Sequence, residues 1–168
     1  GLPRFGFFPG STIGNLRHNE AVQLLGRLRE HRGVGSRLIV GVDLDKDAER
    51  LIAAYDDAAG ITAAFNLNLL ARINREIEPA FDLARFGHEA RYVPTLQRIE
   101  MHLVSTQAQK VRLLGHTIAF RAGETIHTEN SHKYTPEGFR ALAHRAGWTP
   151  SRLWRDDDRL FSMHELVC

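Results

Sequence analysis

Residues 7–16, FFPGSTIGNL, contain a turn whose groups could hold a small polar ligand. Gly10 allows the backbone to approach a ligand closely, because glycine has no Cβ. Ser11 and Thr12 offer hydroxyls, and Asn15 offers both a donor and an acceptor that could grip a carboxylate or an amide. The turn is neither a Walker A loop nor a GxGxxG motif. A tight connection between a strand and a helix, with no ligand, would use the same residue types, so the turn alone leaves both interpretations open.

Histidines and paired acids raise two further possibilities. Four histidines on neighbouring expected strands could form a cupin-like metal site, although their spacing matches no compact ligand motif: His102, His116, His127 and His132. The pair Asp56 and Asp57 could act as general acid and base, but adjacent residues of a helix face different directions, which favours a solvated helix face. We therefore predict no metal ligand and no acid–base pair in this chain.

The turn at residues 9–15 lies inside an expected βαβ unit. Residues 4–8 form a short apolar strand, and after the turn Asn19 is expected to cap a helix that Gly33 ends. SRLIVGVD, which ends at Asp43, is an almost unbroken apolar strand of the kind buried in parallel sheets. Ligands of open α/β sheets bind at the carboxyl ends of strands, so the turn stands where a ligand is expected.

The rest of the chain changes from a helical to an antiparallel pattern. Residues 46–78 predict a pair of helices, with Gly60 and Pro79 as punctuation. Alternating strands are expected over residues 88–130. The last expected elements are a helix over residues 135–147 and a hairpin over residues 151–167. Thr135 would cap the helix, with Pro136 in its first turn and Gly147 past its end.

Composition sets the outer limits of the function. The chain has 168 residues, of which 43% are hydrophobic, and a formal charge of +2 with both signs mixed along its length. This pattern predicts a globular protein without a nucleic-acid partner. No apolar run approaches the roughly 20 residues that span a bilayer, so no membrane partner is expected. The single cysteine, Cys168, has no partner within the chain, which favours a cytoplasmic protein.

Four stretches of the chain, in order, resemble the histidine-specific Nα-methyltransferases: FFPGSTIGN, AAYDDAAGITAAFNLNLLARINRE, RIEMHLVS and GETIHTENSHKYTPEGF. These enzymes use S-adenosylmethionine to make the trimethylated betaine of histidine on the way to ergothioneine. The similarity extends over essentially the whole chain, which makes it more specific than any single motif.

The resemblance implies an α/β fold, the C-terminal part of a class I methyltransferase (Rossmann-like) sheet with an inserted α+β substrate-binding lobe. Residues 1–45 would be the later part of the sheet, residues 46–133 the inserted lobe, and residues 134–168 the return to the sheet with a C-terminal antiparallel hairpin. The family's members are longer. The resemblance therefore implies that most of the S-adenosylmethionine site lies before residue 1, that the N-terminal half of the same protein is a partner, and that this chain is inactive alone.

The resemblance also implies roles for three residues around the reacting amine. Asn15 and Tyr55 would hold the substrate's α-carboxylate, and Gly10 would place its backbone against the cofactor. Two neutral hydrogen-bonding side chains can fix the direction of the amine without adding a cation beside a sulfonium. Tyr55 could instead be a half-buried aromatic residue with a solvated hydroxyl. No catalytic residue is expected, because methyl transfer chiefly needs alignment and the exclusion of water.

For the imidazole of histidine, the resemblance implies hydrogen bonds from Glu129 and Ser131 and a pocket lined by Met101. A neutral imidazole has one N–H and one bare nitrogen, so a carboxylate and a hydroxyl together satisfy both. Residues two apart on a strand face the same side. Glu129 could instead form a surface salt bridge with Lys133, and Met101 could simply fill a core.

Two other functions remain open from the sequence. A related methyltransferase could act on another amino acid, such as a tryptophan derivative, although an indole has no acceptor nitrogen for a second hydrogen bond. The chain could also be a non-catalytic domain that binds a small ligand or a metal.

Overall fold

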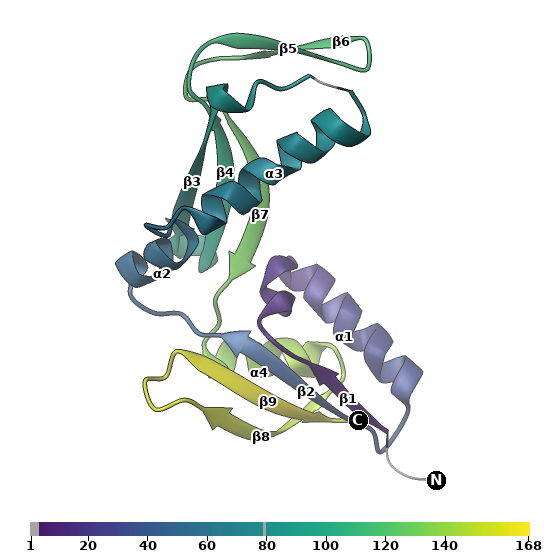
Figure 1. Cartoon of the computed structure of the whole chain (residues 1–168). Helices are drawn as coiled ribbons and strands as arrows, with labels where there is room; N and C mark the ends of the chain where they lie inside the picture. The colour runs from purple at the N-terminus through teal and green to yellow at the C-terminus, as the bar shows by residue number, and fades with distance from the viewer. Residues whose placement is uncertain (1–3, 79) are drawn as a thin grey trace. The chain divides into compact units, whose positions relative to one another are not determined.

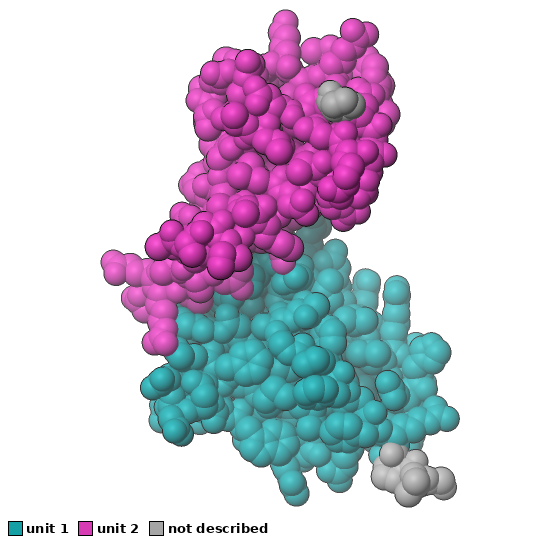
Figure 2. All heavy atoms as spheres, viewed as in Figure 1, with its two compact units in different colours: residues 1–46, 94–98, 130–168 teal, residues 47–93, 99–129 magenta. Residues whose placement is uncertain are grey.

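The computed structural model describes residues 4–78 and 80–168, and these residues form two compact units (Figure 2). Unit 1 contains residues 1–46, 94–98 and 130–168, and unit 2 contains residues 47–93 and 99–129. Pro79, expected to punctuate the helical region, lies outside the described residues. No helix in the described part of the chain is both long and apolar enough to cross a membrane.

Unit 1 is built on a four-stranded sheet with the order β1-β2-β9-β8 (Figure 1). β1 (Phe5–Phe8) is parallel to β2 (Arg37–Asp43), and β9 (Phe161–Val167) is antiparallel to both β2 and β8 (Thr149–Arg155). The helix α1 (His18–Arg32) joins β1 to β2. The expected βαβ unit and the C-terminal hairpin are therefore both present.

Helix α1 begins earlier than its sequence predicts. Arg17, not Asn19, is the N-cap residue, and its backbone N–H donates to Glu20 Oε2 at 2.8 Å. An acid three residues after the cap can accept this bond, whereas Asn19 lies within the first turn. The C-terminal end is as expected, because Gly33 has a φ of 79°, a conformation that glycine adopts without strain.

The core of unit 1 lies between the sheet and two helices, α1 and α4 (Pro136–Arg145). Both helices contribute to one cluster of buried residues, so they cover the same face of the sheet. The Trp148 indole N–H donates to the carbonyl of Leu25 at 2.8 Å, which joins the start of β8 to α1. Thr135 caps α4 as expected, by accepting from the N–H of Gly138 at 3.0 Å.

Unit 2 contains two helices, a hairpin and most of a three-stranded sheet, of which Arg98 and residues 130–132 belong to unit 1 (Figure 1). The helices are α2 (Ala48–Tyr55) and α3 (Ile61–Glu76). The sheet has the order β3-β4-β7, and its strands are β3 (Phe86–Val93), β4 (Arg98–Ser105) and β7 (Thr125–His132). The hairpin consists of β5 (Gln109–Leu113) and β6 (His116–Phe120).

Gly60 marks the start of α3 and has a φ of 70°, in agreement with its expected place between the two helices. Helix α3 packs through Leu70 on Phe86 of β3 and Leu103 of β4. Helix α2 packs through Leu51 on a separate cluster formed by β3 and β4. Both helices therefore cover the sheet of unit 2 through apolar side chains.

Candidate functional site

The turn after β1 is held tightly in unit 1. Ser11 Oγ accepts the backbone N–H of Asp43 at 2.8 Å, which ties the turn to the end of β2. A Cβ on Gly41 would overlap the carbonyl oxygen of Gly10, and a Cβ on Gly14 would lie 2.7 Å from the carbonyl oxygen of His132. Glycines at positions 41 and 14 thus let the turn pack against the ends of β2 and β7.

This packing decides where two of the expected site residues lie. Gly10 follows β1 directly, with a φ of 64°, and Asn15 ends the short 3-10 helix η1 (Thr12–Asn15) with its side chain exposed. Both lie at the carboxyl end of β1. Because Gly14 contacts His132, the turn also lies next to the end of β7, where Ser131 is found.

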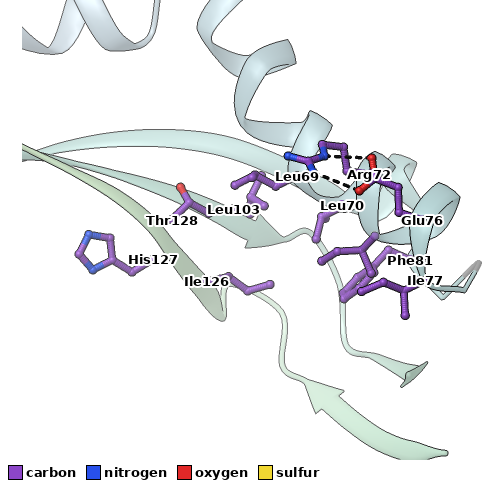
Figure 3. A pocket seen from close by; sticks show the side chains of 11 residues that line it. Leu69, Leu70, Arg72, Glu76, Ile77, Phe81, Leu103, Ile126, His127 and Thr128 are labelled. Atoms are coloured by element: carbon purple, nitrogen blue, oxygen red, sulfur yellow. Dashed lines mark hydrogen bonds and ion pairs between the residues drawn. The ribbon is translucent and has the colours of Figure 1, made fainter. Parts of the chain in front are cut away.

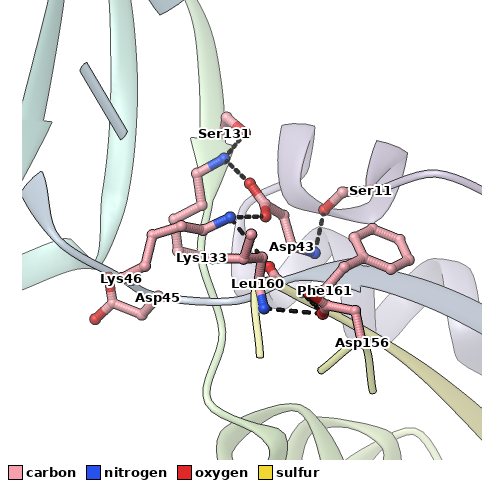
Figure 4. Close-up of polar contacts among 9 residues, drawn as sticks. All are labelled: Ser11, Asp43, Asp45, Lys46, Ser131, Lys133, Asp156, Leu160 and Phe161. Carbon is pink, nitrogen blue, oxygen red and sulfur yellow. Dashed lines mark hydrogen bonds and ion pairs between the residues drawn. The ribbon is translucent and has the colours of Figure 1, made fainter. Parts of the chain in front are cut away.

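Ser131 belongs to a buried polar network around Asp43 (Figure 4). Lys133 Nζ donates to Asp43 Oδ2 at 2.7 Å and to Ser131 Oγ at 2.9 Å. Lys46 Nζ donates to the other carboxylate oxygen of Asp43 and to the carbonyl of Leu160 at 3.0 Å. The carboxylate at the end of β2 is therefore shared by two ammonium groups, one on each oxygen.

Lys133 does not lie on the surface, where the alternative interpretation of Glu129 would place it. Its side chain is 0% exposed, and the residue is among the largest fully buried ones. The hypothesis of a surface salt bridge is therefore wrong for this lysine. A buried ammonium needs an opposite charge, and Asp43 supplies it from a strand 90 residues earlier in the sequence.

Tyr55 is the last residue of α2 in unit 2 and is half-buried. Its backbone carbonyl is 2.7 Å from His88 Nε2, and His88 Nδ1 is 2.9 Å from the amide nitrogen of Asn66. A carbonyl only accepts, so His88 carries its proton on Nε2 and accepts from Asn66 on Nδ1. This chain of hydrogen bonds fixes the end of α2. Residues His88 and Asn66 have no signal in the sequence that would separate them from ordinary polar residues.

Met101 and Glu129 lie on the neighbouring strands β4 and β7 of unit 2. The hydroxyl of Thr128 donates to the carbonyl of Met101 at 2.9 Å, so the two strands are held together beside Glu129. Met101 is 4% exposed and Glu129 is half-buried. Both interpretations of Met101, as a residue that lines a pocket and as a core residue, require a buried side chain.

Two of the four histidines that raised the possibility of a metal site lie together, beside Glu100. The described residues place Glu100, His102 and His127 with one potential ligand atom each within 4.8 Å of one another. The rings of His102 and His127 are stacked at 4.9 Å with planes 20° apart, and Glu100 Oε2 lies 3.0 Å from His102 Nε2. Burial, together with the charges of Arg91 and His127, lowers the pKa of His102, and Glu100 opposes this shift. Ring nitrogens bind metals in the ring plane, and the lone pairs of these two rings lie in nearly parallel planes, which is an unfavourable arrangement for sharing one ion.

An apolar groove of about 460 Å³ lies in unit 2 between α3, β4 and β7 (Figure 3). Its walls include Leu69, Leu103 and Ile126, and the ion pair of Arg72 with Glu76 lies at its edge. None of the six residues expected from the sequence to bind substrate or cofactor lines it.

Comparison with known proteins shows the family to which the chain belongs. Residues 1–168 match the model of a family described as "Histidine-specific methyltransferase, SAM-dependent". The chain belongs to this family. It is 45% identical over 151 residues to a histidine N-alpha-methyltransferase of Mycolicibacterium smegmatis, covering 89% of this chain and 47% of that protein. It is 44% identical over 162 residues to the histidine N-alpha-methyltransferase of Mycobacterium tuberculosis, covering 93% of this chain and 50% of that protein. The chain thus spans about half the length of these relatives.

The fold is that of the same class of enzymes. The structure superposes on the CcbJ methyltransferase of Streptomyces caelestis with a TM-score of 0.51, covering 100% of this chain and 62% of that one, at 13% identity. At this identity the likeness concerns the fold alone. It confirms the predicted α/β methyltransferase architecture for this family member.

Proposed function

We propose that the protein carrying this chain transfers a methyl group from S-adenosylmethionine to the α-amino group of L-histidine. The match of all 168 residues to the histidine-specific methyltransferase family carries this proposal. Repeated transfer would give the trimethylated betaine, a precursor suited to ergothioneine synthesis. The N-terminal half of the same protein would be the partner that completes the enzyme.

The residues of this chain fit a binding and positioning role. Gly10, with its positive φ at the carboxyl end of β1, offers a backbone without a side chain in the way, as close approach of a cofactor requires. S-adenosylmethionine supplies an already activated methyl group. The protein then has to hold a neutral amine in line with that methyl and keep water away.

Asn15 and Tyr55 would fix the amine by holding the α-carboxylate of the substrate. Both are neutral, so they bind a carboxylate through hydrogen bonds and leave the charge balance at the sulfonium unchanged. The hydrogen bond from His88 to the Tyr55 carbonyl supports this role, because it limits the movement of the helix end that carries the tyrosine.

Glu129 and Ser131 would recognise the imidazole. They lie two residues apart on β7, which supports a shared contact with one planar ring. The carboxylate would accept the ring N–H, and the hydroxyl would serve the bare nitrogen. An amino acid with an indole or a phenyl ring would leave at least one of these groups unsatisfied, which disfavours it as a substrate.

The test is a competition assay with the complete protein, S-adenosylmethionine and an equimolar mixture of histidine, tryptophan and phenylalanine. Mass spectrometry of the products should show methylated histidine in large excess. Methylated tryptophan as the main product would replace this proposal by the function of an amino-acid N-methyltransferase with another substrate. No methylated amino acid at all would overturn it.

A further inference from the structure

We propose that Lys133 is a positioning residue that directs the hydroxyl proton of Ser131 toward the substrate, so that the site selects a ring with a bare nitrogen. This inference rests on the proposed function. It adds a residue that does not itself touch the substrate, and a physical reason for the discrimination between rings.

The contacts of Lys133 set the direction of the Ser131 hydroxyl. Lys133 Nζ lies 2.9 Å from Ser131 Oγ (Figure 4). A lysine ammonium has three donors and no acceptor, so in this contact Ser131 Oγ must accept. A serine hydroxyl can otherwise rotate and serve as donor or acceptor toward a ligand. Because Ser131 Oγ accepts from the ammonium, the hydroxyl proton of Ser131 points away from Lys133. A ligand atom that contacts this proton must be a hydrogen-bond acceptor.

The ammonium is held firmly enough to impose this direction. The Lys133 side chain is 0% exposed, and its Nζ lies 2.7 Å from Asp43 Oδ2. Asp43 is itself fixed, because its backbone N–H donates to Ser11 Oγ at 2.8 Å at the end of β2. A buried charge with a paired counter-charge strongly resists rearrangement, since breaking the pair would leave one ion without compensation.

The assignment has a consequence for the ring that binds. Glu129 lies two residues before Ser131 on the same strand. When its carboxylate is ionised, it can accept hydrogen bonds but cannot donate them. One acceptor and one directed donor together match a neutral imidazole in a single tautomer. Without Lys133, the Ser131 hydroxyl could turn and accept instead, and the preference for a bare nitrogen would weaken.

The experiment compares histidine with two analogues, 3-(pyrrol-2-yl)alanine and 3-(pyrrol-3-yl)alanine. Each analogue keeps one ring N–H and has carbon in place of the other nitrogen. The measured quantity is the ratio of kcat/KM for histidine to that for the better analogue, in the complete protein. Lys133→Met should lower this ratio by about 3- to 10-fold, the effect of one hydrogen bond, mainly through KM for histidine. Ser131→Ala should lower it by a similar factor.

The double variant Lys133→Met with Ser131→Ala should show no further loss, because the lysine acts through the serine. Lys46→Met is the matched control. It removes the other ammonium from the same carboxylate but does not contact Ser131 in the described network, so the ratio should stay at the value of the unmodified protein. Equal losses for histidine and both analogues in Lys133→Met, or additive losses in the double variant, would overturn the inference.

Lys133→Met leaves Asp43 with one counter-charge fewer and could prevent folding. The variant Asp43→Asn with Lys133→Met removes the ion pair of Lys133 with Asp43 and leaves only Lys46, whose side chain is partly exposed, as a charge of the network. This variant should fold while showing the same loss of discrimination. Unchanged discrimination in this folded variant would also overturn the inference. If the unmodified protein methylates histidine but Lys133→Met keeps its ratio, only the positioning role fails. If the unmodified protein does not methylate histidine, the proposed function fails first.

Discussion

At the scale of single residues, the candidate site depends on groups of opposite hydrogen-bonding character. Glu129 is an acceptor, whereas Asn15 and Tyr55 can donate to a carboxylate. Ser131 is buried beside Lys133, so its hydroxyl is not an ordinary surface group. These residues should therefore respond differently when the ligand is changed, which separates their roles experimentally.

Replacing Glu129 by alanine should change substrate preference as well as activity. We expect Glu129→Ala to lower kcat/KM for histidine by at least about tenfold, because the ring N–H loses a charged acceptor. Tryptophan and phenylalanine should gain relative to histidine, since they would no longer leave a carboxylate unpaired. The measurement is the product ratio in a competition assay. Glu124→Ala, an exposed acid just before the same strand, should leave the ratio unchanged. The same ratio in Glu129→Ala as in this control would place ring recognition elsewhere.

Removing the side chains proposed to hold the α-carboxylate should weaken the binding of histidine, because its carboxylate loses a hydrogen bond. Asn15→Ala and Tyr55→Phe should each cost about 1 to 3 kcal/mol of binding free energy, the usual effect of unpairing a polar group. Calorimetry with histidine and histidine carboxamide tests this, because the variants should lose most of the preference for the free acid. Tyr92→Phe is the control, since Tyr92 packs on the same apolar cluster as Tyr55. Variants that prefer the acid as strongly as the parent would contradict the assignment.

At the scale of elements, close packing at two glycines positions the turn after β1. Gly41 gives room to the Gly10 carbonyl and Gly14 gives room to the backbone of His132. The turn is thereby held at the ends of two strands, β2 and β7, that are far apart in the sequence. The sequence indicates a glycine-containing turn, but it does not indicate which backbone atoms Gly14 and Gly41 contact.

Gly14→Ala should therefore disturb both stability and ligand binding. Its new Cβ would lie 2.7 Å from the His132 carbonyl oxygen, and the turn would have to move. We expect a loss of about 1 to 3 kcal/mol in the free energy of unfolding, measured by urea denaturation, with weaker histidine binding. Gly26→Ala is the control, because a Cβ there meets nothing within 4 Å. That change in the middle of α1 should stabilise the protein by about 0.5 to 1 kcal/mol. A neutral Gly14→Ala would show that the close contact does not hold the turn.

At the scale of the whole molecule, each unit has its own hydrophobic core, and the core of unit 1 contains a buried histidine. His164 on β9 is 0% exposed, its ring lies 4.6 Å from that of Phe139, and its Nε2 lies 3.0 Å from Ser162 Oγ. Burial, helped by the charge of Arg140 and opposed by Glu137, lowers the pKa of His164 from 6.5 to about 4. The folded protein therefore keeps this ring neutral at pH values where the unfolded chain is protonated.

This difference predicts a loss of stability in mild acid. Between pH 6.5 and about 4 the unfolded state binds more protons at this site than the folded state, so the free energy of unfolding falls as the pH falls. The contribution of His164 is about 3 kcal/mol at most and is fully present only above pH 6.5. Thermal unfolding of the complete protein at pH 7, 6 and 5 should show a smaller decrease of Tm in His164→Gln than in the unmodified protein. His31→Gln, at the exposed end of α1, should retain the original decrease. An identical pH dependence in all three proteins would contradict the assignment.

The sequence by itself determined the order and type of the elements. Alternation and capping signals, which act over a few neighbouring residues, predicted the βαβ unit, the helix pair divided at Gly60, helix α4 and the C-terminal hairpin. The motif similarity predicted the family, which the comparison confirmed. The roles of Asn15, Tyr55, Met101, Glu129 and Ser131 toward substrate, and of Gly10 toward cofactor, stay predictions.

Only the tertiary structure decided which distant groups meet. Asp43 and Lys133 are 90 residues apart, and no local pattern pairs them; in sequence the lysine stands closer to Glu129 and suggests a surface salt bridge. The same holds for the hydrogen bonds from Asn66 through His88 to the end of α2, and for the stacking of His127 on His102 beside Glu100. Local propensities arise from a residue and its near neighbours, whereas burial and charge pairing depend on the packing of whole elements, which one sequence does not reveal.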